Sequence, residues 1–420
     1  MVKKMRDGSA KVYLFNVRDF GAKGDGVTED TKAIQATVDA APDGSLIYFP
    51  PGVYLVGVST PYGIVVKNRS RLRFVGEGGA SVLKVPPERN RRWMTFDDCE
   101  DIEVTRLSFD KNGSTRFGGL AFYSSRRIRI TQNRFFDSAP KMSDGYDRYA
   151  IVFGVGAKVS EDIWVGENII EHLQVEIDKA RRVHIVHNRS LRPEYSAGFG
   201  WFSQTQQAIC EDWMIAGNLV IDPAIYGICV ALDGKRDGSV IRNVVIAENI
   251  IVYRQRVGQG RAIMVGTRPE EDMVAKGVVW ENIAIVNNQI VYEPSLPKPV
   301  ERPALQVATS SGQERMSKLR ISGNLIAGNE KLSAYGMELI GLTDSVINDN
   351  AIYGVRGGIL MRGGFARNFV HSNRVTDVAG AAFHLAQSGG ENVFVSNFVF
   401  GRFGVDFQMD GLQPSDRWQK

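Results

Sequence analysis

The sequence predicts an all-β fold, a parallel β-solenoid, mainly because one short sequence motif recurs ten times between Ile128 and Phe400. Each copy has two apolar residues two positions apart, a short gap, an asparagine and another apolar residue. This period of two indicates strands. Because one such unit is too short to bury its own apolar face, we expect the copies to stack. The ten asparagines are Asn133, Asn168, Asn188, Asn218, Asn249, Asn288, Asn324, Asn350, Asn373 and Asn397.

The spacing and chemistry of the asparagines support the same fold. Successive asparagines lie 20 to 39 residues apart, which is in the range of stacked solenoid units. Asparagine tolerates the left-handed backbone conformation and bonds locally to the backbone, so we expect it to form a sharp bend between two strands. Stacked at the same bend of successive coils, the amides are expected to bond to one another as a ladder.

Length and composition agree with a solenoid. A chain of 420 residues would usually contain two or more globular domains, yet no linker or charge block interrupts this sequence. A solenoid escapes that limit because its core grows along one axis. The 44 glycines suit short strands with tight turns. We expect about a dozen coils over residues 46–410, preceded by an entry segment with a capping helix, 1–45, and followed by a short tail, 411–420.

Charge and cysteine content exclude several classes of function. The net charge of +4 is spread out with no basic stripe, so we expect no nucleic-acid partner. No stretch approaches a membrane span, and the amino terminus lacks the apolar region of a signal peptide. We therefore expect a soluble protein that is cytoplasmic, virion-associated or separated from its signal. Three cysteines, Cys99, Cys210 and Cys229, are too few for a disulfide framework.

The entry segment carries a recognisable pattern. It reads FNVRDFGAKGDGVTEDTKAI over residues 15–34 and GSLIYFPPGVYL over residues 44–55. This resembles the entry segment of the pectate-lyase and polygalacturonase-like superfamily, closely over about the first 85 residues. The resemblance implies a right-handed parallel β-helix and a carbohydrate substrate. It extends to proteins related to glycoside hydrolase family 28 and to phage tail-spikes, which are commonly trimers, so we expect a homo-oligomer, a trimer by that analogy.

The same segment predicts the capping helix. Thr28 is the expected N-cap, with Glu29 and Asp30 in the first turn, where acidic groups are favourable. Ile34 and Val38 form an apolar stripe that can plug the open end of the solenoid. We expect Gly44 to end the helix.

The catalytic hypothesis depends on the outward residues of a second strand that is expected in each coil. The segments 173–178, 199–204, 228–233 and 263–268 align by their apolar positions, with the first, third and fifth residues pointing inward. The segment 199–204 fits either of two frames, and a slip of one residue would exchange its faces. In the preferred frame the outward column consists of Asp178, Gln204, Asp233 and Arg268, with Glu176 beside Asp178.

This column can support hydrolysis. Parallel strands stack about 4.8 Å apart, so side chains two coils apart lie about 9.6 Å apart. Inverting glycoside hydrolysis needs carboxyl groups about 6.5–9.5 Å apart, and Asp178 and Asp233 approach that separation. Glu176 would raise the pKa of a neighbouring acid, while Arg268 and Gln204 would bind substrate. The alternative is that outward carboxylates only keep the surface soluble.

Long loops flank the same coils, as expected of a binding surface. Five residues in or near these loops are candidates for substrate binding, with aromatic rings for sugar faces and polar groups for hydroxyls: Tyr146, Asp147, Arg148, Trp201 and Phe202. Taken singly, each aromatic can equally be a packing residue. The later outward residues Tyr335, Glu338, Arg362 and His384 alternate in type, and we expect no cluster among them.

Three functions remain open. The leading hypothesis is a carbohydrate-active enzyme that hydrolyses glycosidic bonds of a poly- or oligosaccharide with paired carboxylic acids, without cofactor or metal. The first alternative is a lyase that acts by β-elimination on a uronate polymer, for which calcium would be the cofactor. The second is a non-catalytic glycan-binding or tail-spike module. The superfamily's polygalacturonase motifs are not found in this sequence, so the resemblance transfers no catalytic residue to it.

Overall fold

The computed structural model describes residues 3–7, 10–88, 90–114, 118–140, 149–154, 156–193, 199–203, 207–232, 236–255, 260–267, 276–309 and 314–419. Only the backbone is described for residues 3–7, 10–12, 201–203, 329–331 and 333. The chain divides into two compact units, Met1–Tyr195 (unit 1) and Ser196–Lys420 (unit 2).

Unit 1 holds the helical elements of the described chain: η1 (Val17–Phe20), α1 (Thr31–Ala40) and η2 (Gly78–Ala80). Its strands are β1 (Lys3–Asp7), β2 (Ala10–Asn16), β3 (Asp25–Glu29), β4 (Ser45–Tyr48), β5 (Gly52–Leu55), β6 (Ile64–Lys67), β7 (Ser70–Val75), β8 (Ser81–Lys84), β9 (Arg92–Asp97), β10 (Glu100–Thr105), β11 (Ser108–Asp110), β12 (Gly119–Tyr123), β13 (Arg126–Thr131), β14 (Arg134–Phe136), β15 (Tyr149–Phe153), β16 (Ser160–Gly166), β17 (Ile169–Glu171), β18 (Gln174–Ile177), β19 (Ala180–Val186) and β20 (Arg189–Leu191).

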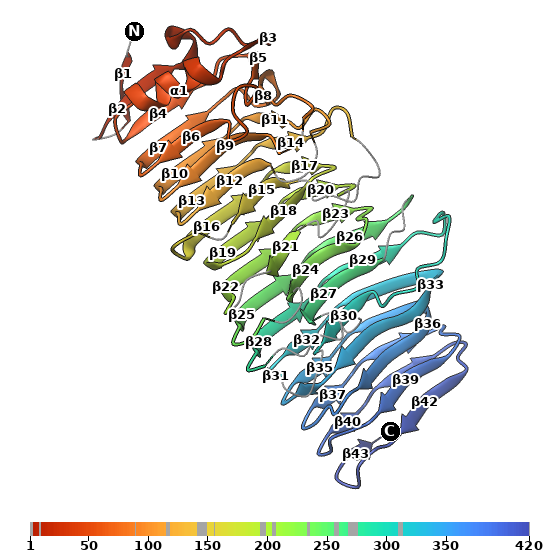
Figure 1. Cartoon of the computed structure of the whole chain (residues 1–420). Helices are drawn as coiled ribbons and strands as arrows, with labels where there is room; N and C mark the ends of the chain where they lie inside the picture. Colours follow the sequence, from red (N-terminus) through yellow and green to blue (C-terminus); the bar gives the residue numbers. More distant parts are fainter. Residues whose placement is uncertain are drawn as a thin grey trace. The chain divides into compact units, whose positions relative to one another are not determined.

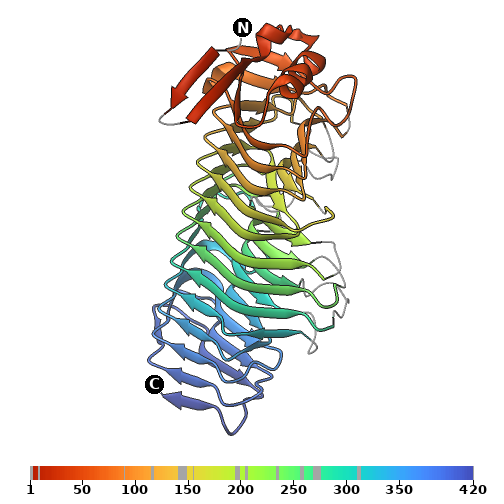
Figure 2. The ribbon, with the colours of Figure 1, turned by 90° about the vertical axis from the view of Figure 1, so that its left-hand side faces the viewer.

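These strands stack into three faces, visible as successive rungs in Figures 1 and 2. Face 1 contains β4, β7, β10, β13, β16 and β19. Face 2 contains β3, β5, β8, β11, β14, β17 and β20. Face 3 contains β6, β9, β12, β15 and β18. All these pairs are parallel, whereas β1 and β2 pair antiparallel. Unit 1 is therefore a parallel β-helix, as predicted.

Unit 2 has the same three faces. Its strands are β21 (Phe199–Ser203), β22 (Ile209–Ala216), β23 (Leu219–Ile221), β24 (Tyr226–Leu232), β25 (Val240–Ala247), β26 (Ile250–Tyr253), β27 (Arg261–Thr267), β28 (Val279–Val286), β29 (Gln289–Tyr292), β30 (Leu305–Ala308), β31 (Arg315–Ser317), β32 (Arg320–Ser322), β33 (Leu325–Ile340), β34 (Leu342–Thr343), β35 (Val346–Asn348), β36 (Ala351–Arg362), β37 (Phe369–His371), β38 (Arg374–Thr376), β39 (Ala381–Ala386), β40 (Val393–Val395), β41 (Phe398–Phe400), β42 (Val405–Asp410) and β43 (Arg417–Gln419).

The two long strands of unit 2, β33 and β36, bend from face 2 into face 3 and pair along both. Face 3 runs through β21, β24, β27, β30, β33, β36, β39 and β42. The register pairs Phe199 with Ile228, and Phe199 is buried. The strand at 199–203 therefore follows the preferred frame.

The helix α1 caps the amino-terminal end of unit 1, where it packs on η1 and β6 (Figure 1). Ile34 and Val38 are buried, as predicted. The predicted ends of the helix are wrong. Thr28 lies in β3, where its hydroxyl donates to the Asp25 carboxylate at 2.8 Å, and the N-cap is Asp30. The helix ends at Ala40, before Gly44 is reached.

The Asp30 carboxylate has another use, which explains why it does not cap the helix. Its two oxygens accept the backbone N–H groups of Lys23 at 2.6 Å and Gly24 at 3.0 Å. Asp30 therefore holds the glycine turn of the entry segment against the first turn of the helix. Glu29 instead accepts hydrogen bonds from the hydroxyl of Thr31 and from Ser59.

The predicted asparagine ladder is present in both units. In unit 1, Nδ2 of Asn133 donates to Oδ1 of Asn168 at 3.2 Å, and Asn168 donates to Asn188 at 3.0 Å. In unit 2, the ladder runs from Asn218 through the next five asparagines to Asn397, with distances of 2.8–3.0 Å. Each Oδ1 that accepts an amide in the ladder also accepts a backbone N–H, for example that of Asn168 on Asn188 at 3.0 Å. The ladder thus satisfies buried polar groups of the bend.

The asparagines themselves do not adopt the left-handed conformation, so that part of the prediction is wrong. The residue before each asparagine does, with φ between 50° and 66°, for example Glu167, Glu248 and Asn287. The left-handed residue of the bend therefore comes one position before the asparagine, whose amide forms the ladder. A second ladder, not predicted, lies at the bend from face 3 to face 1, where Asn368 donates to Asn392 at 3.0 Å.

The interior of each unit repeats in register. In unit 1, the rings of Phe96, Phe122 and Phe153 stack with centroids 4.5 and 4.7 Å apart. In unit 2, Tyr253 stacks on Tyr292 at 4.7 Å. These separations match the spacing of about 4.8 Å between parallel strands, so inward side chains of successive coils stack directly on one another.

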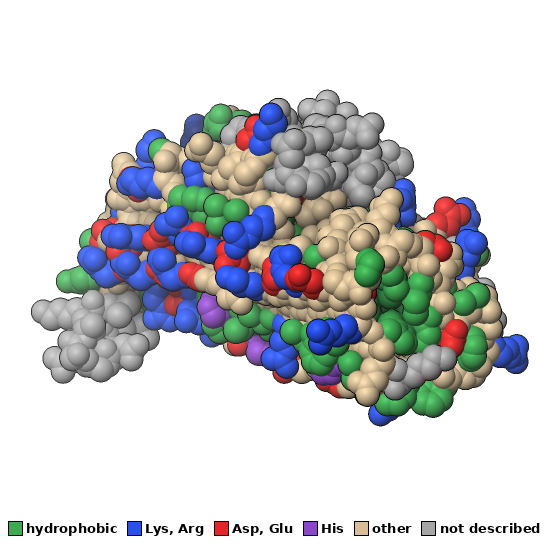
Figure 3. Space-filling view, turned by 90° about the horizontal axis from the view of Figure 1, so that it is seen from below, with side chains coloured by type: hydrophobic (Ala, Val, Ile, Leu, Met, Phe, Trp, Pro, Cys, Tyr) green, Lys and Arg blue, Asp and Glu red, His purple; other side chains and the backbone are tan. Residues whose placement is uncertain are grey.

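The exposed surface carries many paired charges. Figure 3 shows Lys and Arg interleaved with Asp and Glu over part of one side. In unit 1, Arg73 bonds Glu103 at 2.7 Å and Arg182 bonds Asp162 at 2.6 Å, both across neighbouring strands of face 1. Exposed pairs of this kind contribute about 0–1 kcal/mol each. They compensate one another's charge along this face more than they stabilise the fold.

Candidate functional site

The outer surface of β12, β15 and β18 in unit 1, called the acidic face below, holds two of the predicted catalytic residues. The register aligns Ala121, Val152 and Glu176 in one row. Asp178 follows β18, and its backbone N–H bonds the carbonyl of Phe153 at 2.9 Å. Val175 and Ile177 point into the interior and are fully buried, whereas Glu176 and Asp178 are half-buried. The alternation of the strand therefore presents both carboxylates on the outside, as predicted.

One of the two carboxylates, that of Glu176, lies next to a phenol. Tyr149, at the start of β15, is buried, and its hydroxyl lies 3.3 Å from Oε1 of Glu176. Residues two apart on a strand are about 6.6 Å apart along it. This backbone spacing is close to the lower end of the range of about 6.5–9.5 Å that inverting hydrolysis needs between its two carboxyl groups.

An aromatic residue and an arginine continue the acidic face toward the preceding coils. The guanidinium of Arg92 lies 5.5 Å from the ring centre of Tyr123 and 5.6 Å from that of Tyr62. The Tyr123 ring covers Gly154, where an added Cβ would meet it at 2.5 Å. Only glycine leaves room for the ring in that position. Rings and guanidinium groups exposed on one face can bind sugar faces and acidic groups.

A buried lysine that was not predicted from the sequence lies beside the start of β12. Lys111 has no exposed surface, and its Nζ bonds the carbonyl of Arg91 at 3.3 Å and lies 5.6 Å from the ring centre of Trp93. An added Cβ on Gly118 would lie 2.0 Å from that Nζ, so the ammonium is directly beside the start of β12. A buried cation is costly unless compensated. No motif in the sequence marks this lysine.

Most other predicted site residues lie outside the described part of the chain. These are Gln204, Asp233 and Arg268 of the predicted column, and Tyr146, Asp147 and Arg148 of the predicted loop. Trp201 and Phe202 lie in β21, and only their backbone is described. The four-coil column of Asp178, Gln204, Asp233 and Arg268 stays a prediction.

The corresponding surface of β24 and β27 in unit 2, called the closed face below, is mainly apolar and continues onto Ala308 of β30. Cys229, Ala231, Met264, Ala308 and Ile340 form one buried cluster there, joined by Tyr226. Cys229 is a buried free thiol, as predicted. Burial of these outward positions removes them from contact with a large ligand.

Farther along face 3 of unit 2, outward polar residues form two hydrogen-bonded groups. Glu338 accepts Nε2 of Gln306 at 2.6 Å and the guanidinium of Arg362 at 2.9 Å. The prediction that these later outward residues would not cluster is wrong. It failed because residues aligned one coil apart are brought within about 4.8 Å of each other, whatever their separation in the sequence.

The second group is a Tyr–His–Asp chain on the last coils. The Tyr335 hydroxyl lies 2.8 Å from Nδ1 of His384, and Nε2 of His384 lies 2.9 Å from Oδ2 of Asp410. Burial raises the pKa of Tyr335. The hydrogen bond from His384 lowers the pKa of Asp410. A base oriented by a third group is the arrangement that activates hydroxyl groups, so this chain is a secondary acid–base candidate.

Two negative findings apply to the described residues. Within them, no group of three or more His, Cys, Asp or Glu side chains is placed to hold a metal ion. Nor does any helix in that part of the chain have the length and apolar character needed to cross a membrane.

The stacked faces of both units define a parallel β-helix. Residues 14–117 match the family model described as "Rhamnogalacturonase A/epimerase, pectate lyase-like". The resemblance stated for the entry segment is therefore confirmed. The matched segment ends before β12, so it covers the entry coils and not the acidic face.

Two curated relatives from Azotobacter vinelandii are similar over short segments. Mannuronan C5-epimerase AlgE2 is 45% identical over 75 residues, 17% of this chain and 8% of the relative. Alginate lyase 7 is 44% identical over 122 residues, 26% of this chain and 14% of the relative. The matches thus span well under a fifth of either relative's length.

A solved structure shows the same fold over nearly the whole chain. The surface adhesin PfbA of Streptococcus pneumoniae superposes with a TM-score of 0.58, covering 90% of this chain and 93% of the adhesin, at 17% sequence identity. At that identity the likeness concerns the fold alone.

Proposed function

We propose that this chain is an enzyme that acts on an acidic polysaccharide, and that the acidic face of unit 1 is its catalytic surface. The observation that carries the proposal is the placement of Glu176 and Asp178, two half-buried carboxylates on the outside of one strand with the Tyr149 hydroxyl 3.3 Å from the first. Two carboxyl groups on one face, one of them within reach of a hydroxyl group, are candidates for general acid–base chemistry.

The substrate class is inferred from the relatives and from the chemistry of the face. The curated relatives are named for mannuronan and alginate, which are uronate polymers. Arg92 offers a guanidinium beside two tyrosine rings, a combination suited to a carboxylate-bearing sugar.

The reaction proposed first is hydrolysis of a glycosidic bond. In this scheme Glu176, beside Tyr149, gives its proton to the leaving oxygen, and the Asp178 carboxylate takes a proton from the water that adds to the anomeric carbon. The spacing of about 6.6 Å along the strand suits a water-mediated, inverting displacement. Asp233 remains the alternative partner for Asp178.

The second candidate is proton abstraction at C5 of a uronate, which Tyr149 and the relatives favour. A base removes the C5 proton, and the electron pair then either expels the C4 oxygen, leaving a C4–C5 double bond, or is reprotonated from the other side to give the epimer. A buried phenol within 3.3 Å of a carboxylate can exchange the proton that either route needs.

One experiment separates these reactions. The protein is incubated with polymannuronate, polygalacturonate and a neutral glucan, and products are followed by mass spectrometry, ultraviolet absorbance and NMR. Hydrolysis gives shorter chains that have gained one water per cut and do not absorb. β-Elimination gives chains that absorb and have gained no water, whereas epimerisation changes the NMR spectrum at constant mass. If no substrate changes on prolonged incubation, the enzyme proposal is abandoned in favour of a binding module.

A further inference from the structure

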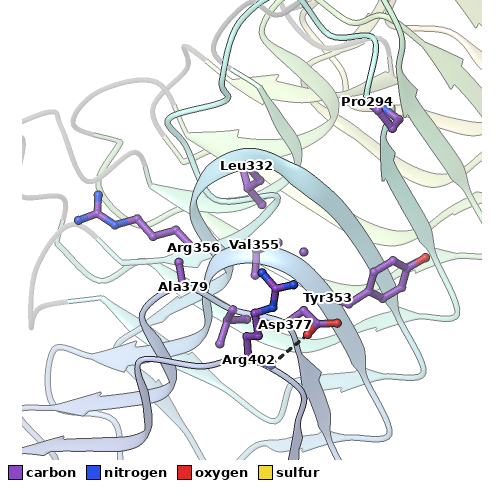
Figure 4. Close-up of a pocket in the computed structure, with 10 residues that line it drawn as sticks. Pro294, Leu332, Tyr353, Val355, Arg356, Asp377, Ala379 and Arg402 are labelled. Carbon is purple, nitrogen blue, oxygen red and sulfur yellow. Dashed lines mark hydrogen bonds between the residues drawn. The ribbon is translucent and has the colours of Figure 1, made fainter.

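Unit 2 has a groove of about 870 Å³, called the arginine groove below, that none of the functions above uses (Figure 4). It lies where β36, β38 and β41 pass into face 3. Leu332, Val355 and Val378 line it and are almost fully buried, with exposures of 1–3%. They give the groove an apolar floor.

The rim of the groove is polar and exposed. Arg356, Tyr353 and Arg402 line it, and all three are exposed. In Figure 4, Arg402 lies near Val355 and Asp377, Tyr353 lies to one side, and Arg356 extends to the other. Within the described part of the chain, neither guanidinium has an ion-pair partner. This differs from the paired charges of face 1.

Successive coils shape the groove. Backbone hydrogen bonds link the bends, from the N–H of Gly380 to the carbonyl of Arg356 at 2.6 Å and from that of Gly404 to the carbonyl of Gly380 at 3.1 Å. Arg356 and Arg402 thus stand two coils apart, about 9.6 Å along the axis. The coil between them contributes the small Ala379, which leaves the space open.

Asp377, an acidic residue that lines the groove, accepts a hydrogen bond from the backbone. Oδ1 of Asp377 accepts the backbone N–H of Arg402 at 3.0 Å, which fixes the bend that carries this arginine. This hydrogen bond positions the bend, and within the described residues no ion pair joins Asp377 to either guanidinium group.

We propose that the arginine groove binds a segment of an acidic polysaccharide, as a second carbohydrate site separate from the acidic face. The apolar floor contacts the C–H face of a sugar ring, the Tyr353 ring packs at its side, and Arg356 and Arg402 bind carboxylates of sugars along the chain. The ligand class follows from charge complementarity between two unpaired cations and a polyanion. The inference rests on the proposed function in one respect: the polyanion is taken to be the same acidic polysaccharide that the enzyme acts on.

The test measures binding of polymannuronate and polygalacturonate oligomers by isothermal titration calorimetry, with carboxyl-reduced oligomers as neutral controls. The background is Glu176→Gln/Asp178→Asn, so that no turnover disturbs the measurement. We expect the double variant Arg356→Gln/Arg402→Gln to weaken binding at least about tenfold, since charge-assisted hydrogen bonds are lost. Tyr353→Ala should weaken it less.

The matched control is Arg374→Gln, an exposed arginine on β38 that does not line the groove. It should bind like the parent, and circular dichroism should show that all variants are folded. Equal affinity of the double variant and its parent would overturn the inference, as would equal binding of neutral and acidic oligomers. Such a failure leaves turnover at the acidic face intact. Failure of the proposed function instead appears as an absence of turnover in the unmodified protein.

Discussion

The two units repeat one strand pattern, yet their outer surfaces differ. At the outward positions of β18, unit 1 carries Glu176 and, just after the strand, Asp178, both half-buried. In the alignment of residues 173–178 with 228–233, the position of Glu176 is taken in unit 2 by Ala231, which is fully buried. The inward positions are apolar in both. The β-helix fold therefore requires apolar side chains only at the inward positions. The outward side chains are free to differ, and functional residues are expected among them.

The largest expected effect is on turnover at the acidic face. Glu176→Gln and Asp178→Asn should each lower turnover of the acidic polysaccharide by about 10²- to 10⁴-fold, because each removes a proton donor or acceptor from the reaction. Initial rates on the substrate found active measure this. Glu167→Gln, an exposed carboxylate at the asparagine bend of the same unit, is the control and should keep full activity.

Asp233→Asn decides between the two possible partners of Asp178. If Asp233 is the second acid, its variant loses turnover while Glu176→Gln retains it, and the assignment moves to the column predicted from the sequence. If Asp178→Asn itself retains full activity, neither pairing holds and the acidic face is not the catalytic surface.

The ladder shared by both units should give the next largest effect, on stability. Asn288→Ala removes an amide that donates to Asn324 at 2.9 Å and an oxygen that accepts the backbone N–H of Asn249 at 3.1 Å. Leaving buried partners unsatisfied should lower the free energy of unfolding by about 2–4 kcal/mol. Urea denaturation monitored by circular dichroism measures the change.

Asn168→Ala is the same change in unit 1 and should cost a similar amount, because its amide makes the same kinds of hydrogen bond. Gln289→Ala, which truncates an exposed amide next to Asn288, is the control and should change stability by less than about 0.5 kcal/mol. Equal costs for Asn288→Ala and Gln289→Ala would contradict a structural role for the ladder.

The ladder also shows what the sequence could predict. A repeated asparagine at a fixed position among apolar residues predicted the stacked coils, the strands and the hydrogen-bonded amides. The prediction succeeded because every coil has the same bend, with the same buried backbone groups to hydrogen-bond. The ends of α1 were missed because Thr28 and Asp30 make hydrogen bonds within the entry segment, and such partners depend on how the turn folds.

The candidate site was less accessible to sequence reasoning. Strand alternation correctly placed Glu176 and Asp178 on the outer surface, since a period of two separates the faces. It gave no sign of Tyr149 or of the buried Lys111, because their contacts cross from one coil to another. The arginine groove was missed for the same reason: Arg356 and Arg402 are 46 positions apart in the sequence and two coils apart in space.

A smaller effect is expected when an ion pair with one nearly buried carboxylate is compared with a pair that is exposed on both sides. Glu338→Gln weakens the bonds of a nearly buried carboxylate with Gln306 and Arg362 and should lower the free energy of unfolding by about 1–2 kcal/mol. Glu293→Gln removes a partner of Arg254 at 2.9 Å on the exposed surface and should cost less than about 0.5 kcal/mol. If both variants lose the same amount in urea denaturation, burial does not distinguish the two pairs.

The smallest effect concerns acid and the entry segment of unit 1. Hydrogen bonds from the backbone N–H groups of Thr28 and Val27 lower the pKa of Asp25 to about 2 from the ordinary value of 3.8. Because the folded-state pKa is depressed, the stabilisation is complete above pH 4 and is lost as the pH falls from 4 toward 2. Asp25→Asn should therefore melt a few degrees lower at most at pH 6, and the difference should vanish near pH 2. Thr28→Val, which removes the hydroxyl donor to this carboxylate, should show part of the same pH dependence. Melting curves in which the Asp25→Asn difference persists unchanged down to pH 2 would show that the carboxylate charge does not hold this turn.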